Sequence, residues 1–234
     1  MQQNVWQALR DFEYWPEIWQ GTLDTLAMTG FALLFTVLIG LPLGTILFLT
    51  SPAHRSANGV TARLQRISYR LLSFTVNVLR SVPFLILLIL LIPATRLIVG
   101  SSLGVRGAIP PLVIATAPFF ARLVENVLRE VEVGVFETCR AIGATTRQTV
   151  LWALLPESLA SLLAAITVTA IALIGYSAMS GVIGGGGLGD LAVRYGYQRF
   201  ETRVMVVTVI LLVLIVQLVQ WLGDRLVARL AHRS

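Results

Sequence analysis

The chain has 234 residues, of which 56% are hydrophobic and only 13% are charged, and its net charge is +6. Soluble domains carry about 25% charged residues, so this composition excludes a soluble globular protein. Nucleic-acid binding is not needed to explain the positive charge, because arginines beside apolar segments orient a membrane protein. A single cysteine, Cys139, excludes an internal disulfide and a multi-cysteine metal site.

Five apolar stretches are long enough to cross a bilayer, which takes about 20 apolar residues in a helix. The second is interrupted by Arg80 and Arg96, and the third continues as an amphipathic segment through Leu128. Only helices and closed barrels satisfy the backbone in lipid, and these stretches are too long for barrel strands. We therefore predict an all-α polytopic membrane protein with five transmembrane helices. The stretches cover residues 26–49, 71–98, 107–121, 159–183 and 204–222.

The arginines predict the orientation of these helices. Eleven lie between stretches one and two, between three and four, or after stretch five, and six lie on the other side. Because cytoplasmic segments carry the excess of positive charge, the N-terminus is expected outside and the C-terminus in the cytoplasm. No cleavable signal peptide is expected, because the first 24 residues contain acidic residues and no apolar core. The tryptophans of residues 1–20 (Trp6, Trp15 and Trp19) predict a short stretch at the outer interface, with Tyr195, Tyr197 and Phe200 at a similar depth.

The membrane segments lack the groups that several function classes need. No carboxylate lies between Asp24 and Glu125, and none lies in stretches four or five. Secondary transporters usually place an ionisable group near the midplane, although backbone carbonyls can also hold sodium. Ser177 loosely resembles a nucleophile, but no histidine lies in the membrane segments to activate it. The sequence therefore argues against an enzyme and disfavours an ion-driven transporter.

A run of glycines, residues 184–187 and 189, follows the fourth stretch. We interpret it as a flexible turn at the outer end of that stretch. A nucleotide-binding loop would need a preceding strand, a following helix and, in P-loop proteins, Lys-Ser/Thr, and Asp190 would repel phosphate. Any ATP that drives this protein is therefore expected on another chain.

Residues 137–156 are too polar to cross a membrane and predict two short helices broken near Gly143. Small residues before the break would let the first helix enter a groove on a partner, and glycine permits a left-handed turn. The alternative is an amphipathic connector that rests on the membrane surface.

This loop resembles the coupling motif of bacterial ABC importer permeases, E-A-A-x3-G-x9-I-x-L-P. Glu137, Gly143, Leu155 and Pro156 fall at matching spacings, while Thr138 and Cys139 replace the two alanines and Ala153 the isoleucine. The resemblance implies that the loop inserts into a cleft on an ATP-binding subunit. The residues expected to contact that ATPase are Glu137, Thr138, Cys139, Arg140, Ala141, Gly143, Ala144, Leu155 and Pro156.

Further blocks resemble the methionine-importer permeases, among them residues 22–29, 80–84, 92–100, 117–119, 122–126, 175–179, 186–189 and 195–197. The resemblance implies a permease of the bacterial inner membrane that imports L- and D-methionine by alternating access. Its permease domain would span residues 21–230 with a cytoplasmic coupling loop at 129–156. The implied partners are a second copy of the chain, two ATP-binding subunits, a periplasmic methionine-binding lipoprotein and membrane lipids, with no nucleic acid. ATP and Mg²⁺ would sit on the ATPase, and this chain would hold no cofactor or metal.

Three alternatives stay open: a permease for another amino acid or small peptide, a transporter or channel subunit that uses no ATP, and a membrane scaffold. If the protein is a scaffold, removal of the 137–156 loop would affect only complex formation. The prolines in the membrane segments argue mildly against a scaffold, because they provide points about which helices can pivot.

Three smaller expectations concern the membrane segments. The outer end of the fourth stretch (Tyr176, Ser177, Met179 and Ser180) is expected to form the outer gate, unless its hydroxyls only bond to their own helix. Gly40 and Gly44 predict close helix packing. Arg80 is expected either to snorkel to the cytoplasmic side or to have a structural role at the inner mouth of a dimer, with Glu125 or a backbone carbonyl as its partner.

Overall fold

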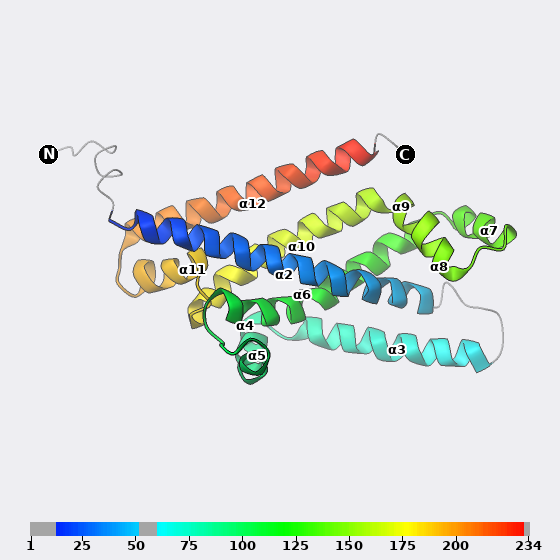
Figure 1. Ribbon diagram of the computed structural model, residues 1–234, viewed down its shortest axis with the longest axis horizontal. Helices are drawn as coiled ribbons and strands as arrows, with labels where there is room; N and C mark the ends of the chain where they lie inside the picture. Colours follow the sequence, from blue (N-terminus) through cyan, green and yellow to red (C-terminus); the bar gives the residue numbers. More distant parts are fainter. Residues whose placement is uncertain (1–12, 52–59, 232–234) are drawn as a thin grey trace.

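The computed structural model describes residues 13–51 and 60–231, and every regular element in these ranges is helical. The long helices run side by side along the long axis of the molecule, with α7 and α8 at one end and α11 at the other (Figure 1). The α-helices are α2 (Trp15–Thr50), α3 (Val60–Ser81), α4 (Phe84–Leu90), α5 (Ile92–Val99), α6 (Gly104–Arg129), α7 (Val133–Ala141), α8 (Thr146–Gln148), α9 (Leu155–Glu157), α10 (Leu159–Ser180), α11 (Gly187–Leu191) and α12 (Thr202–Ala231). Between them lie two π-helices, η2 (Thr149–Leu154) and η4 (Ala192–Tyr197), and a 3-10 turn, η3 (Gly181–Ile183).

Four of the five predicted membrane helices are confirmed as long apolar helices: α2, α6, α10 with η3, and α12. The first is longer than its apolar stretch, since α2 has 36 residues and so spans about 54 Å. It begins at Trp15, so the expected boundary between residues 20 and 21 falls inside a continuous helix. Trp6 lies outside the described residues.

The second predicted span is wrong as a single helix. The axes of α3 and α4 differ by 100° across the break at Val82 and Pro83. Proline lacks the N–H that would bond back into α3, and it pushes the preceding residue out of the α conformation. A second proline, Pro93, stands in the first turn of α5, directly after the next break. The apolar stretch is therefore three helices that turn through the bundle.

Helices α2 and α6 pack with their backbones in contact, as Gly40 and Gly44 predict. A Cβ atom on Gly44 would lie 2.4 Å from the Ala121 carbonyl oxygen and 2.6 Å from the Val124 Cβ. Farther along the same interface, the hydroxyls of Thr36 and Thr116 form a buried hydrogen bond of 2.7 Å. Small residues let membrane helices approach this closely, and a polar pair then adds an interhelical bond.

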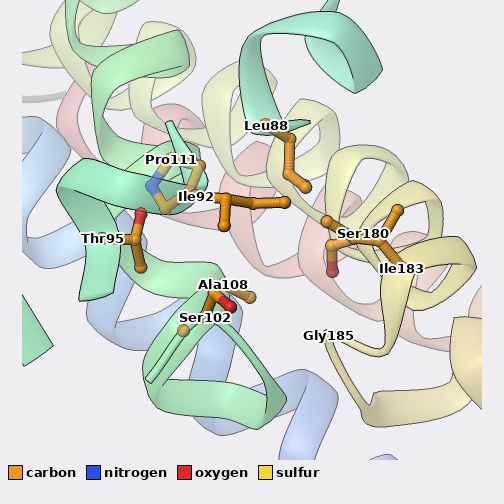
Figure 2. Close-up of a pocket in the computed structure, with 10 residues that line it drawn as sticks. Leu88, Ile92, Thr95, Ser102, Ala108, Pro111, Ser180, Ile183 and Gly185 are labelled. Carbon is orange, nitrogen blue, oxygen red and sulfur yellow. The ribbon is translucent and has the colours of Figure 1, made fainter. Parts of the chain in front are cut away.

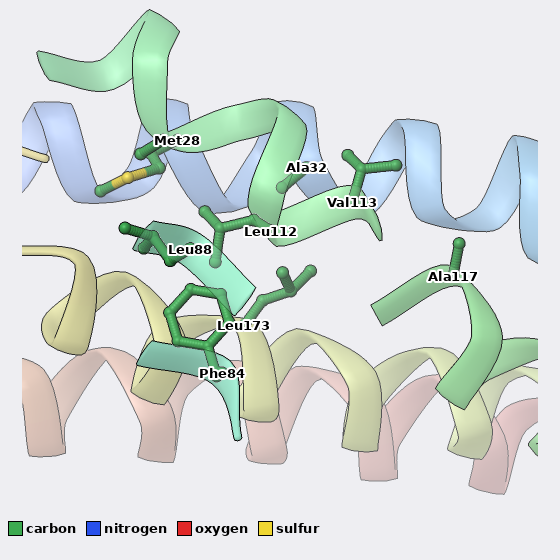
Figure 3. Close-up of a cluster of buried hydrophobic side chains, with 9 residues drawn as sticks. Met28, Ala32, Phe84, Leu88, Leu112, Val113, Ala117 and Leu173 are labelled. Carbon is green, nitrogen blue, oxygen red and sulfur yellow. The ribbon is translucent and has the colours of Figure 1, made fainter. Parts of the chain in front are cut away.

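The bend at Pro83 brings α4 into the core of the bundle. Figure 3 shows two of its buried side chains, Phe84 and Leu88, in a cluster between α2, α6 and α10. The cluster therefore joins four helices that come from distant parts of the sequence. Its buried members are Met28, Ala32, Phe84, Leu88, Ala108, Leu112, Val113, Ala117 and Leu173.

The glycine run makes the expected turn, but it is tightly packed and it opens α11, a helix that the sequence analysis did not predict. Gly184, Gly186 and Gly187 all have positive φ, which other residues rarely adopt. The backbone N–H of Leu188 donates to the Thr25 hydroxyl of α2 over 2.9 Å, so a distant threonine satisfies one of the free amides at the start of α11. A helix does therefore follow the run, while Lys-Ser/Thr is absent.

We predict that Gly44→Ala destabilises the protein, because the added methyl group would force α2 and α6 apart. Overpacking of this kind costs about 1–3 kcal/mol, which lowers the melting temperature by about 2–10 °C for a domain of this size. Thermal unfolding of the purified protein in detergent measures it.

Gly30→Ala is the matched control on the same helix, because a Cβ there meets nothing within 4 Å. It should leave the melting temperature unchanged or raise it slightly, since alanine favours helix. Equal melting temperatures for the two variants would contradict the close approach.

Candidate functional site

The segment that resembles the coupling motif is built around a fixed turn at Gly143. Gly143 has φ +73° and closes α7: its N–H donates to the Arg140 carbonyl and the Ala144 N–H donates to the Cys139 carbonyl. This is the Schellman arrangement that ends helices at a left-handed glycine. The predicted break near Gly143 is confirmed, and the residues on either side of it fix its geometry.

A capping box begins the second part of the segment. The Thr145 hydroxyl accepts from the Gln148 N–H, and the Gln148 side chain accepts in return from the Thr145 N–H over 2.8 Å. Such a reciprocal pair satisfies two free amides at a helix start. The helix then widens into the π-helix η2 before Pro156, in the first turn of α9. Local sequence therefore sets the shape of the loop on both sides of the turn.

The outer surface of this loop is open to solvent. Most of the residues expected to contact an ATPase are exposed: Glu137, Thr138, Arg140, Ala141, Gly143 and Pro156, while Cys139, Ala144 and Leu155 are half-buried. Three large apolar side chains are exposed in the same segment; Leu151 is 47% exposed, and the two most exposed are Ile142 with 76% and Trp152 with 81%. The sequence analysis did not place any of the three among the contact residues. The sequence did contain a signal for them, because large apolar side chains in a segment too polar to cross the membrane indicate a contact surface.

The inner surface of the loop is part of the apolar core. Val150 and Leu154 of η2 are buried against the ends of α2, α6 and α10, and the Phe48 and Phe136 rings lie 5.8 Å apart. Burial of this kind fixes the loop to three long helices. The buried members of this part of the core are Phe48, Phe120, Val124, Leu128, Val150, Leu154, Leu162 and Ala165.

A buried carboxylate lies just behind the loop, at the end of α6. Glu125 has no exposed surface and forms salt bridges with Arg122 and Arg129 of the same helix. Its Oε1 also accepts from the Tyr69 hydroxyl of α3 over 3.2 Å. Of the alternatives for Arg80, a pairing with Glu125 is not what this structure shows: the Arg80 guanidinium lies 5.7 Å from the centre of the Phe119 ring, and Glu125 pairs with Arg122 and Arg129. The spacing of residues 122, 125 and 129 indicates the ion pairs within α6, but no sequence signal points to α3.

The residues expected at the gate lie at the other end of α10 and face different ways. Ser177 and Ser180 are buried and donate to carbonyls of their own helix, at Ile174 and Ser177. Tyr176 is half-buried and its ring stacks on Phe84 of α4, with 4.7 Å between the ring centres. Met179 is 42% exposed. The structure thus brings Tyr176 against α4 and leaves Met179 on the surface.

Two hollows lie toward this end of the molecule. The first is a cavity of about 10 Å³ between α4, α5, the start of α6 and the end of α10, with Leu88, Ile92 and Ser180 in its wall (Figure 2). It has room for about one water molecule. The second, about 340 Å³, is an open groove between the start of α2 and α11. Its size falls within the range of small-molecule sites. Its charged lining residues are Glu17, Asp24, Asp190 and Arg194. Among the described residues, no three His, Cys, Asp or Glu side chains come together as a metal site.

Comparison with known proteins gives one consistent result. A model of the family described as binding-protein-dependent transport system inner membrane component matches residues 57–232. The probable D-methionine transport system permease protein MetI of Pasteurella multocida is 47% identical over 222 residues, which cover 93% of this chain and 99% of the relative. The methionine import system permease protein MetP of Bacillus subtilis is 46% identical over 212 residues, with coverage of 89% and 90%.

The fold is also similar to solved structures. A chain of the MetNI methionine ABC transporter in inward-facing conformations superposes with a TM-score of 0.88 at 45% identity, covering 94% of this chain and 99% of that chain. A chain of an amino acid ABC transporter shares the fold at 21% identity, with a TM-score of 0.69 and coverage of 97% and 98%.

We predict that Gly143→Ala opens the turn between α7 and α8. A side chain in the left-handed conformation costs about 1–2 kcal/mol, which raises the open fraction about 5- to 30-fold. Arg140 and Arg147 are exposed on either side of the turn, so the initial rate of tryptic cleavage at these arginines reports the opening.

Gly134→Ala in α7, the helix that Gly143 ends, is the control. A Cβ at Gly134 or at Gly143 meets nothing within 4 Å, and of these two glycines only Gly143 has positive φ. Its cleavage rate should match that of the wild type. Identical rates for both variants would show that the turn does not depend on the left-handed residue.

Proposed function

The chain belongs to the family of binding-protein-dependent transport system inner membrane components, and we propose that it is the permease subunit of an ATP-driven importer for methionine. The observation that carries this proposal is the similarity to the Pasteurella multocida permease, which extends over 99% of that relative's length. The resemblance inferred from the sequence is thereby confirmed. The protein is a multi-pass component of the bacterial inner membrane.

We propose that the loop at 129–156 faces the cytoplasm and docks on the ATPase. Its outer surface supports this role because it joins a rigid turn to two exposed apolar side chains, Ile142 and Trp152. Single exposed apolar residues are ordinary on a protein surface. Here Ile142 stands at the end of α7, beside the turn fixed by Gly143 and Thr145, and Trp152 follows on η2. A surface that enters a cleft requires such a fixed geometry.

The inner surface of the loop supports coupling. ATP and Mg²⁺ would bind to the partner subunits, and closure of these subunits would displace the loop. Because Val150 and Leu154 are buried against the ends of α2, α6 and α10, a displaced loop has to carry these helices along. The chain would then alternate between inward-open and outward-open states without any covalent chemistry of its own.

We further propose that Tyr176 and Met179 contribute to the outer gate. Met179 is exposed and has a soft, flexible thioether, which suits contact with an apolar side chain of the solute. Ser177 and Ser180 bond within α10, so their contribution is to hold the end of the helix in place. The complete importer would contain two copies of this chain, two ATPase subunits and a methionine-binding lipoprotein on the outside, the side on which the N-terminus is expected.

The function is tested in a host strain deleted for its own methionine uptake, in which this chain is expressed with the ATPase and binding protein of the same genome. Labelled L-methionine at low external concentration should accumulate, and omission of this chain should abolish uptake. Excess unlabelled D-methionine should compete. Depletion of ATP at clamped ion gradients should stop uptake, because no ion gradient drives the cycle.

Persistence of uptake without ATP would identify an ion-driven transporter instead. An assembled complex that accumulates another amino acid or a peptide, and not methionine, would overturn the solute assignment alone.

The gate is tested by single cysteines in a Cys139→Ala background, which places the family's usual alanine at that position. Met179→Cys should react with a membrane-impermeant maleimide added from outside during turnover. Ser180→Cys should react slowly or not at all, because Ser180 has no exposed surface. If cysteines at 176, 177, 179 and 180 stay unreactive in every state of the cycle, these residues do not form the gate.

A further inference from the structure

Helices α6 and α3 meet along a line of polar side chains, which we term the polar seam. On α6 it consists of Arg122, Glu125 and Arg129, and on α3 of Tyr69, Ser73 and Asn77. Spacings of three and four residues place each set on one face of its helix. The seam is missing from the sequence predictions because its two halves are far apart in the chain.

Hydrogen bonds join α6 to α3 at both ends of the seam. Arg122 salt-bridges Glu125 and donates to Ser73 Oγ and Asn77 Oδ1, each over 2.9 Å. Arg129 salt-bridges the other carboxylate oxygen and donates to the Tyr69 hydroxyl over 2.9 Å. The carboxylate of Glu125 holds both guanidinium groups, and they in turn hold α3.

These contacts fix the position of α3 along α6, not only its attachment. Apolar side chains such as Leu72 and Val76 also pack α3 onto its neighbours, and such packing is not directional. The groups that hold Glu125 also bond to α3, and hydrogen bonds that involve a charged group are directional and stronger than neutral ones. Sliding of α3 along α6 would separate Glu125 and its arginines from Tyr69, Ser73 and Asn77.

The seam lies between the two proposed functional regions. Glu125 is four residues before the end of α6, and α7 of the coupling loop begins shortly after. At its other end α3 bends by 100° into α4, where Phe84 stacks on Tyr176 at 4.7 Å between ring centres. One chain of contacts from the coupling loop to the gate therefore passes through the seam and α4, beside the direct route along α10.

We propose that Glu125 is a positioning residue for transport: it makes α3 move with the coupling loop, so that the movement reaches α4 and Tyr176. Glu125 would touch neither the solute nor the ATPase. The inference rests on the proposed function, because it assumes an ATPase that displaces the loop.

Glu125→Gln tests this, with Asp224→Asn as control, since Asp224 is an exposed carboxylate on α12 that accepts only from Gln220 within its helix. In liposomes containing the whole complex and supplied with binding protein, methionine imported per ATP hydrolysed should fall about 2- to 30-fold in Glu125→Gln. The control should keep the wild-type ratio. A purely structural seam would lower the melting temperature and leave the ratio of the folded complexes unchanged, which would overturn the proposal.

A second readout does not depend on the solute. Spin labels at Leu71 of α3 and Thr138 of α7, both exposed, report the distance between helix and loop in the Cys139→Ala background. This distance should stay constant between the nucleotide-free and ATP-trapped complex in the wild type and change by about 1–2 Å or more in Glu125→Gln. If it changes equally in both, α3 does not follow the loop and the inference is wrong.

Two further outcomes are assigned in advance. If Glu125→Gln does not assemble, Tyr69→Phe/Ser73→Ala/Asn77→Ala decides. It removes the side-chain hydrogen bonds from α3 to the seam while Glu125 keeps both arginines. An unchanged ratio and distance would then overturn the inference. A wild-type complex that imports no methionine but shows the expected distances would overturn the solute assignment and leave the role of Glu125 supported.

Discussion

The constraint on which this structure depends is that a polar group inside the membrane must find its partner within the protein. Most of the buried hydroxyls of the described residues meet it within their own helix: Thr25, Thr29, Thr169, Ser177 and Thr208 each donate to a carbonyl three or four residues back. Among the described residues, the only buried side-chain oxygen without a partner is that of Ser51, at the end of α2. Most buried hydroxyls therefore form their hydrogen bonds within their own helix, and polar contacts between helices are few.

Because they are few, the polar contacts between helices mark where the bundle is fixed. Thr36 and Thr116 join α2 to α6 at the glycine-lined interface. Thr25 joins α2 to the start of α11. The polar seam around Glu125 joins α6 to α3, and it is the only one of these three joints in which charged side chains take part. Its two salt bridges lie within α6, so sliding of α3 would leave them intact but would break the hydrogen bonds to Tyr69, Ser73 and Asn77. Hydrogen bonds that involve a charged group are stronger than a bond between two hydroxyls, so this joint resists sliding more than the other two.

The sequence predicts what local chemistry determines and misses what distant residues determine. Apolar length indicated four of the helices, and Gly143 indicated the break in the loop, since the left-handed conformation is a local property of glycine. The bend at Pro83 was missed because proline permits either a kink or a full break, and packing of Phe84 and Leu88 in the core decides between them. Helix α11 was missed because five residues containing two glycines predict no helix, and its start is satisfied by Thr25, 163 positions away.

The same division explains why the sequence left the partner of Arg80 open and did not give the partners of Glu125 on α3. Both lie at positions where sequence spacing gives several partners within reach, and only the placement of α3 against α6 selects among them. In the proposed cycle this placement has a mechanical consequence. The coupling loop is stiff because its turn and cap are local, its inner face is buried against three helices, and the seam adds α3 to the same unit. Movement relative to this unit is then concentrated at the breaks before α4 and α5, where backbone hydrogen bonding is already interrupted by Pro83 and Pro93. In this cycle the helix breaks at Pro83 and Pro93, which were not predicted from the sequence, are the places where α4 can move relative to α3. Movement of the coupling loop can reach Tyr176 through them.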